Sequence, residues 1–201
     1  MKRAALLIAA FGLFSTSFAQ ESLVKGVMGQ FELSPTEAAM AIVVADALGM
    51  KVDAVVRISN DHDEPFSIIG PALIIGKYTH HDVGYVLRHR GNGKAWGNVA
   101  KELGMHPGDF NKMRVKGESF ESGIWINLLS TRYGMKSGDY SRNKQKGLSD
   151  FDLVLAAVVS KGKTKDFDST CDKIKAKMPK KGGGEGHGNS GGHGGGHGHG
   201  G

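Results

Sequence analysis

The sequence is almost without cysteine: Cys171 is the only one among 201 residues. A single thiol cannot close a disulfide within one chain, and it cannot supply the paired cysteines of a structural zinc site. Cys171 is therefore either a buried thiol or one half of a disulfide between two chains. It falls within a helical pattern of apolar residues, which favours the buried thiol.

The short motifs that mark common enzyme sites are also missing. The sequence contains no nucleophile elbow, no phosphate-binding loop and no HExxH helix. Its serines and carboxylates are scattered at positions where they would cap helices, so capping already explains them. We therefore predict a non-enzymatic protein that requires no cofactor.

The N-terminal apolar run is too short to be a membrane span. It covers residues 4–14, whereas a helix that crosses a bilayer needs roughly 20 apolar residues. Lys2 and Arg3 precede it, and the tripeptide SFA at 17–19 fits the small-x-small pattern of a cleavage site. This order favours a cleaved signal peptide over 1–19 rather than a membrane anchor. We expect an exported protein, periplasmic or extracellular, with no transmembrane segment after cleavage.

The sequence also has only a small excess of positive over negative charge. Loss of Lys2 and Arg3 with the signal peptide leaves 24 basic against 20 acidic residues, a net charge of +4 with histidine neutral. The excess is concentrated in KIKAKMPKK, which contains Lys173, Lys175, Lys177, Lys180 and Lys181. Such a run is usually a solvated helix end. The functional alternative is attraction to an anionic surface such as envelope polymer, lipid headgroups or nucleic acid.

The middle of the chain contains an internal repeat. GMKVDAV at Gly49, GMHPGDF at Gly104 and GMKSGDY at Gly134 align without gaps, and GKYTHHDV at Gly76 fits with one extra residue. The glycines are 27, 28 and 30 residues apart, a spacing typical of helical hairpins. Each unit is predicted to be a helix ending at glycine, a short turn and a second helix. The first buried residues of the second helices are predicted to be Val55, Val83, Phe110 and Tyr140.

Helix-start signals support the same division. Ser34-Pro35-Thr36-Glu37 has the form of a capping box, and Ser137 and Ser149 resemble further caps. Gly70-Pro71 is expected to break or kink its segment. The segments GIWINLLSTRY and FDLVLAAVV, taken alone, would also suit strands, but hairpin-turn signals are nearly absent.

We therefore predict an all-α fold, a small bundle or array of helix-turn-helix-like hairpins over 34–178. A linker over 20–33 is expected to precede it. A disordered Gly/His-rich tail over 179–201 is expected to follow it.

One hairpin has a recognisable signature. In WGNVAKELGMHPGDFNKMRVKG, the small residue, turn glycine and buried apolar residue of a helix-turn-helix are Ala100, Gly104 and Phe110. Together with the signal peptide and the Gly/His-rich end, the segment GKAWGNVAKELGMHPGDFNKM resembles a group of uncharacterised secreted bacterial proteins built on GxxWxx(I/V)AxxLG hairpins. The resemblance covers about residues 36–162. It implies a helical architecture and supplies no catalytic residues.

A helix-turn-helix raises the possibility of DNA binding. Lys112, Arg114 and Lys116 would lie on or just past the second helix, in reach of phosphate. Export and a mature charge of only +4 argue against a sequence-specific DNA regulator.

Histidines within the predicted domain are weaker metal candidates. NDHDEP, over 60–65, collects three carboxylates and His62, but it lacks the spacing of a calcium loop, and we favour acidic residues that cap the helix beginning at Pro65. His81 and His89 are eight residues apart, two helical turns, too far for one tetrahedral ion. His80, His81 and His89 are expected on the helix surface, and His106 in the turn before a helix.

The C-terminal tail is the strongest metal candidate. Residues 182–201 contain 13 glycines and four histidines, His187, His193, His197 and His199. Imidazole suits zinc, nickel and copper, and glycine lets distant ligands converge. His197 and His199 should bind first and His193 next, because the intervening loops are shortest. The alternative is a hydrophilic spacer whose histidines gain charge below about pH 6.5.

The leading hypothesis is an exported, non-enzymatic helical protein whose tail binds divalent transition metal ions with modest affinity. The alternative is a structural or interaction module of the cell envelope. In that case the hairpin array binds a protein or an anionic polymer.

Overall fold

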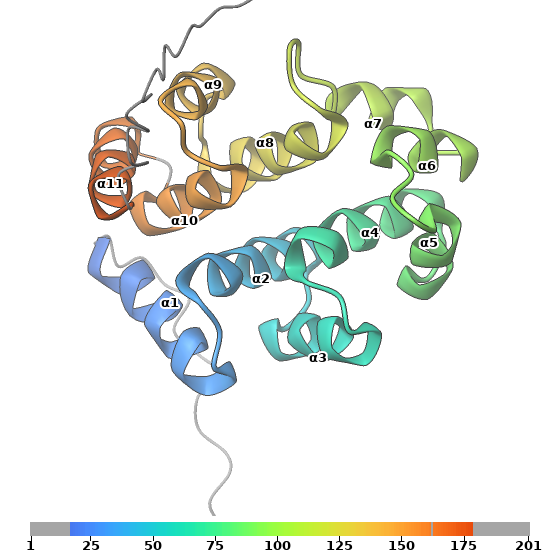
Figure 1. Cartoon of the computed structure of the whole chain (residues 1–201), viewed down its shortest axis with the longest axis horizontal. Coiled ribbons are helices and arrows are strands. Elements are labelled where there is room, and N and C mark those ends of the chain that lie inside the picture. The colour runs from blue at the N-terminus through green and yellow to red at the C-terminus, as the bar shows by residue number, and fades with distance from the viewer. Residues whose placement is uncertain (1–16, 162, 179–201) are drawn as a thin grey trace, which may run out of the picture.

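The protein is all-helical throughout the part that its computed structural model describes, residues 17–161 and 163–178 (Figure 1). These residues form eleven helices and no strand, which confirms the predicted fold class. None of these helices combines the length and the apolar character that a membrane crossing requires. Residues 1–16 of the predicted signal peptide and the predicted tail, 179–201, lie outside the described residues.

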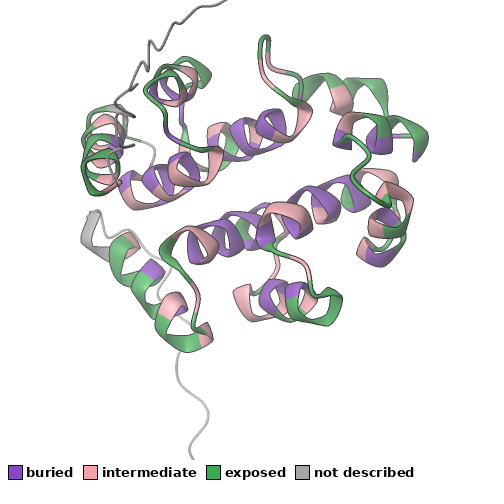
Figure 2. Ribbon diagram, viewed as in Figure 1, coloured by how far each residue is buried: buried purple, intermediate pink, exposed green. Residues whose placement is uncertain are grey.

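Ten of these helices form five consecutive pairs, each made of an inner helix followed by an outer one. The inner helices are α2 (Pro35–Leu48), α4 (Phe66–Thr79), α6 (Trp96–Glu102), α8 (Phe120–Tyr133) and α10 (Asp150–Ser160). The outer helices are α3 (Val52–His62), α5 (Val83–Arg90), α7 (Pro107–Lys112), α9 (Ser137–Gln145) and α11 (Thr164–Lys177). Buried residues concentrate on α2, α4, α8 and α10 (Figure 2). The hairpin repeat is thus confirmed, and the pair α10–α11 extends it.

A residue in the left-handed conformation connects the two helices of every pair. These residues are Gly49, His80, Gly104, Gly134 and Lys161, with φ between 51° and 77°. The sixth residue after each of them points toward the core: Val55, Val86, Phe110, Tyr140 and Phe167. All are fully buried except Phe110, which is partly buried. Aligned on the turn residue, the five units match without gaps.

The prediction of a turn at Gly76 was wrong, because α4 continues to Thr79 and turns at His80. Gly76 serves a different purpose. A Cβ atom there would lie 2.6 Å from the carbonyl oxygen of His81, so glycine lets the chain fold back over the helix. Because the turn falls later, Val86 rather than Val83 is the first buried hydrophobic side chain of α5.

The inner helices pack side by side and bring the two ends of the array together. α2 packs against α4 and α8, and it also packs against α10 of the last pair. Helix α1 (Ser17–Phe31) lies against both α2 and α10 (Figure 1). Segment 20–33, expected to be a linker, belongs to this helix as far as Phe31. Its Val24 and Val27 are buried.

Two of the three predicted serine caps are confirmed. Ser34 and Ser149 each form a capping box with the third residue of their helix. Ser137 is instead the first residue of α9, whose N-cap is Lys136. The break expected at Gly70-Pro71 is absent, since α4 runs through both residues.

Gly70 allows helices α2, α4 and α8 to meet. A Cβ atom at Gly70 would lie 2.6 Å from the Trp125 ring of α8 and 3.2 Å from Val44 of α2. Trp125 is fully buried. A larger residue at Gly70 would therefore displace a ring that has no free space around it.

We predict that Gly70→Ala lowers the free energy of unfolding by about 1–3 kcal/mol through overpacking, measured by urea denaturation. The matched control is Gly26→Ala in α1, where nothing lies within 4 Å of the added Cβ. There alanine should be neutral or should stabilise by up to about 1 kcal/mol. Equal stability of the two variants would show that the contact of Gly70 with Trp125 is not tight.

Candidate functional site

The structure does not place the predicted metal ligands. His187, His193, His197 and His199 lie outside the described residues, as do Lys180 and Lys181. Within the described ranges, no group of three or more His, Cys, Asp or Glu side chains is arranged to hold a metal ion.

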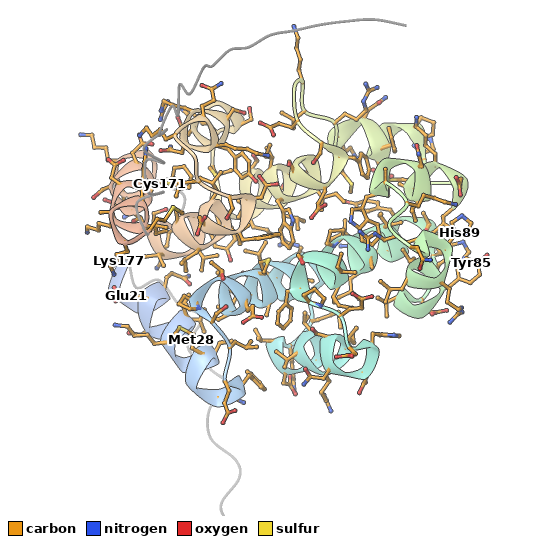
Figure 3. All side chains as sticks on the ribbon, in the orientation of Figure 1. Glu21, Met28, Tyr85, His89, Cys171 and Lys177 are labelled. Atoms are coloured by element: carbon orange, nitrogen blue, oxygen red, sulfur yellow. The ribbon has the colours of Figure 1, made fainter. Side chains whose placement is uncertain are left out.

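The other three predicted lysines lie on the second half of α11. Lys173, Lys175 and Lys177 are all exposed, and among the described residues no carboxylate lies within salt-bridge distance of them. Lys173 and Lys177 share one face of the helix, near Glu21 of α1 (Figure 3). The pKa of Glu21 is lowered first by a hydrogen bond from Lys25 and further by these two lysines. The end of α11 is therefore a basic surface with one acidic neighbour.

Cys171 lies on the opposite, inward side of α11 and is fully buried, as predicted. Burial raises the pKa of its thiol to about 12. A thiol in this position is unreactive, and a disulfide to a second chain would require α11 to leave the core.

Segment 60–65 forms neither a metal site nor the predicted cap. Helix α4 begins after Pro65 without any side chain on its first N–H groups. The segment instead ends α3. Asp63 adopts the left-handed conformation, and the Ser59 hydroxyl donates to the Glu64 carbonyl at 2.6 Å. The acidic residues are thus used at a helix C-terminus, which sequence reasoning missed.

His81, which precedes α5, and His89 of α5 are stacked on a tyrosine rather than simply exposed. His81 and Tyr85 have ring centroids 4.5 Å apart, and Tyr85 and His89 follow at 6.3 Å. His89 also contacts Glu102 of α6 at 2.8 Å. The Tyr85 ring thus stacks with two imidazoles, one from the segment before α5 and one from α5 itself.

The hairpin α6–α7 has the turn of a helix-turn-helix but no recognition helix. Gly104 is left-handed and Ala100 is fully buried, as the signature requires. However, α7 is six residues long and contains no fully buried residue. His106 precedes it as predicted, and its Nδ1 accepts a hydrogen bond from the Gly108 N–H at 3.1 Å. The hairpin thus shares the turn of a helix-turn-helix but has only a six-residue second helix.

A polar cluster that the sequence did not reveal joins α8, α9 and α10. The Lys144 ammonium lies 2.9 Å from both Glu118 and the Ser122 hydroxyl, and 2.7 Å from Asp150. Glu118 and Ser122 precede Lys144 and Asp150 by more than 20 residues, so no local pattern indicates the cluster.

The cluster resembles a Ser–Lys catalytic dyad in its distances but not in its electrostatics. Burial alone would lower the pKa of Lys144, but its bonds to Asp150 and Glu118 outweigh burial and raise it. A lysine held in the charged form cannot take a proton from Ser122. Ser122 is also only 1% exposed, so no substrate reaches it. The cluster ties three helices together.

Two hollows lie on the surface of the described domain. The smaller, of about 260 Å³, lies at the end of α2, where Lys77 and Arg132 donate to the Ala47 carbonyl at 3.0 and 3.3 Å. These cations cap a helix C-terminus, which accounts for their position. The larger, of about 500 Å³, lies between α7, the loop 113–119 and α8. Neither hollow is lined by histidine.

No protein-family model, curated protein or solved structure matches this chain. The resemblance to secreted hairpin proteins therefore stays a prediction from the residues that carry it.

The carboxyl group of Glu121, near the cluster around Lys144, is destabilising at neutral pH. Burial raises the pKa of Glu121, and the neighbouring Asp150 raises it further. The folded protein therefore holds the proton of the Glu121 carboxyl group more tightly than the unfolded chain does. The contribution of Glu121 to stability therefore falls as the pH rises above about 4.3, the pKa of a glutamate in the unfolded chain.

We predict that Glu121→Gln is more stable than the unmodified protein at pH 7 and that the difference vanishes near pH 3, where both forms are uncharged. Urea midpoints at the two pH values test this. Glu32→Gln, which removes the same charge at an exposed position, is the matched control. A Glu121→Gln effect that is the same at both pH values would mean that charge is not its cause.

Proposed function

We propose that the protein is an exported, non-enzymatic helical protein whose Gly/His-rich tail binds divalent transition metal ions with modest affinity. The observation that carries the proposal is the composition of the segment after α11, with four histidines and 13 glycines over 182–201. Neutral imidazole is a good ligand for zinc, nickel and copper, and a glycine-rich sequence lets distant ligands converge.

Chain entropy sets the expected order of binding. His197 and His199 are two residues apart, so they meet one ion at the least cost, and His193 joins next. Closing the ten-residue loop back to His187 costs on the order of 2 kcal/mol. Binding should therefore be modest and should discriminate little among these metals.

Helix α11 anchors this segment to the domain. Phe167 and Cys171 are fully buried, and α11 packs against α10. Metal capture by the tail would thus occur beside a folded surface that already carries exposed lysines.

We predict that removal of residues 182–201 abolishes binding of nickel, copper and zinc in calorimetry of the mature protein. His197→Gln with His199→Gln in the full tail should weaken binding about tenfold or more, because the shortest chelate is lost. His187→Gln is the matched control and should weaken it less. Equal binding by the full and shortened proteins would remove the tail from the mechanism.

The exposed lysines of α11 favour a second candidate function. In this case the protein is an interaction module that binds an anionic envelope polymer. Lys173, Lys175 and Lys177 lie in the last two turns of one helix and lack a salt-bridge partner among the described residues. Such a surface attracts polyanions through counterion release, and the attraction weakens with salt.

We predict that changing these three lysines to glutamine weakens binding to polyphosphate and flattens the plot of log affinity against log salt concentration. The control changes three other exposed lysines, Lys51, Lys136 and Lys163, and so removes the same net charge. The two variants are compared by fluorescence anisotropy with labelled polyphosphate. Identical losses in both would indicate attraction to net charge and no site on α11.

A further inference from the structure

The loop 113–119 between α7 and α8 is fixed at both ends. At its start Met113 is 2% exposed, and its carbonyl oxygen packs so closely on Gly123 of α8 that any Cβ there would overlap it. At its end the Glu118 carboxylate accepts hydrogen bonds from Lys144 at 2.9 Å and from Ser141 at 3.2 Å. The loop is therefore a preformed wall of the larger hollow.

Between these fixed points the loop carries two cationic side chains that do not support the fold. Arg114 and Lys116 are exposed, and in the described part of the chain neither side chain makes a hydrogen bond or a salt bridge. Both line the hollow. Glu118 also lines it, but Lys144 and Ser141 already engage both of its oxygens.

The remaining wall of the hollow is aromatic. Phe110 of α7 and Phe120 of α8 stack with ring centroids 4.6 Å apart, and both are only partly buried. The Lys101 ammonium lies 5.2 Å from the Phe110 centroid. An apolar ring pair thus lies next to two unpaired cations, and a third cation stands behind it.

We propose that this hollow, lined by Phe110, Phe120, Arg114 and Lys116, binds a small amphiphilic anion. The apolar body of the ligand lies against the two rings, and its carboxylate lies between the two cations. The volume of about 500 Å³ falls within the range of small-molecule sites. A bare inorganic anion would leave the rings in water, and a neutral apolar molecule would leave the cations unpaired. The fixed loop lowers the entropic cost of binding, because its backbone is already ordered.

Calorimetry with octanoate, octanol and inorganic sulfate tests the proposal on the full mature protein, with a chelator present so that the tail holds no metal. Octanoate should bind at least about tenfold more tightly than octanol or sulfate. If octanol bound as tightly as octanoate, the hollow would recognise only the apolar part of the ligand. If sulfate bound as tightly as octanoate, the hollow would recognise only the negative charge. Either result overturns the proposal.

Variants locate the site. Arg114→Gln with Lys116→Gln should weaken octanoate about tenfold and leave octanol unchanged. Phe110→Ala should weaken both, and thermal melts verify that it folds. Lys51→Gln with Lys136→Gln removes the same net charge elsewhere and should change neither. Octanoate binding that survives the Arg114/Lys116 change would place the ligand outside this hollow. The outcome is independent of metal binding by the tail.

Discussion

The contact between Gly70 and Trp125 determines how closely the inner helices approach. Because Gly70 has no side chain, the Trp125 ring of α8 lies directly on α4, and Val44 of α2 meets it there. Three inner helices from three different pairs thus share one point of contact. Four of the outer helices, α3, α5, α9 and α11, then pack against their own inner partners, and in each the sixth residue after the left-handed turn is fully buried. Features at the surface, including the larger hollow, depend on this arrangement.

Local signals predicted the helical class and the hairpin repeat, because both are recorded in short stretches. Gly49, Gly104 and Gly134 adopt the left-handed turn that a glycine there indicates. The turns at His80 and Lys161 were missed because those residues adopt the same conformation without being glycine. Gly76 was misleading because glycine is also selected by close packing, and sequence alone does not separate the two causes.

The candidate sites were predictable only where residues are neighbours in the chain. The basic end of α11 is visible as a run of lysines, and His106 precedes its helix as expected. By contrast, the cluster around Lys144 and the hollow that contains Arg114 depend on contacts across tens of residues. The helical character of α1 was within reach, since Val24, Val27 and Phe31 recur at helical spacing.

The contact between α2 and α10 distinguishes this array from an open solenoid. In an open solenoid each unit touches only its neighbours, so units are added or lost at the ends with little effect on the rest. Here the first inner helix completes its burial against the last, across more than 100 residues of chain. Because synthesis begins at the N-terminus, α2 cannot complete its packing until residues 150–160 have been made. The first hairpin therefore completes its core only when the last one is present.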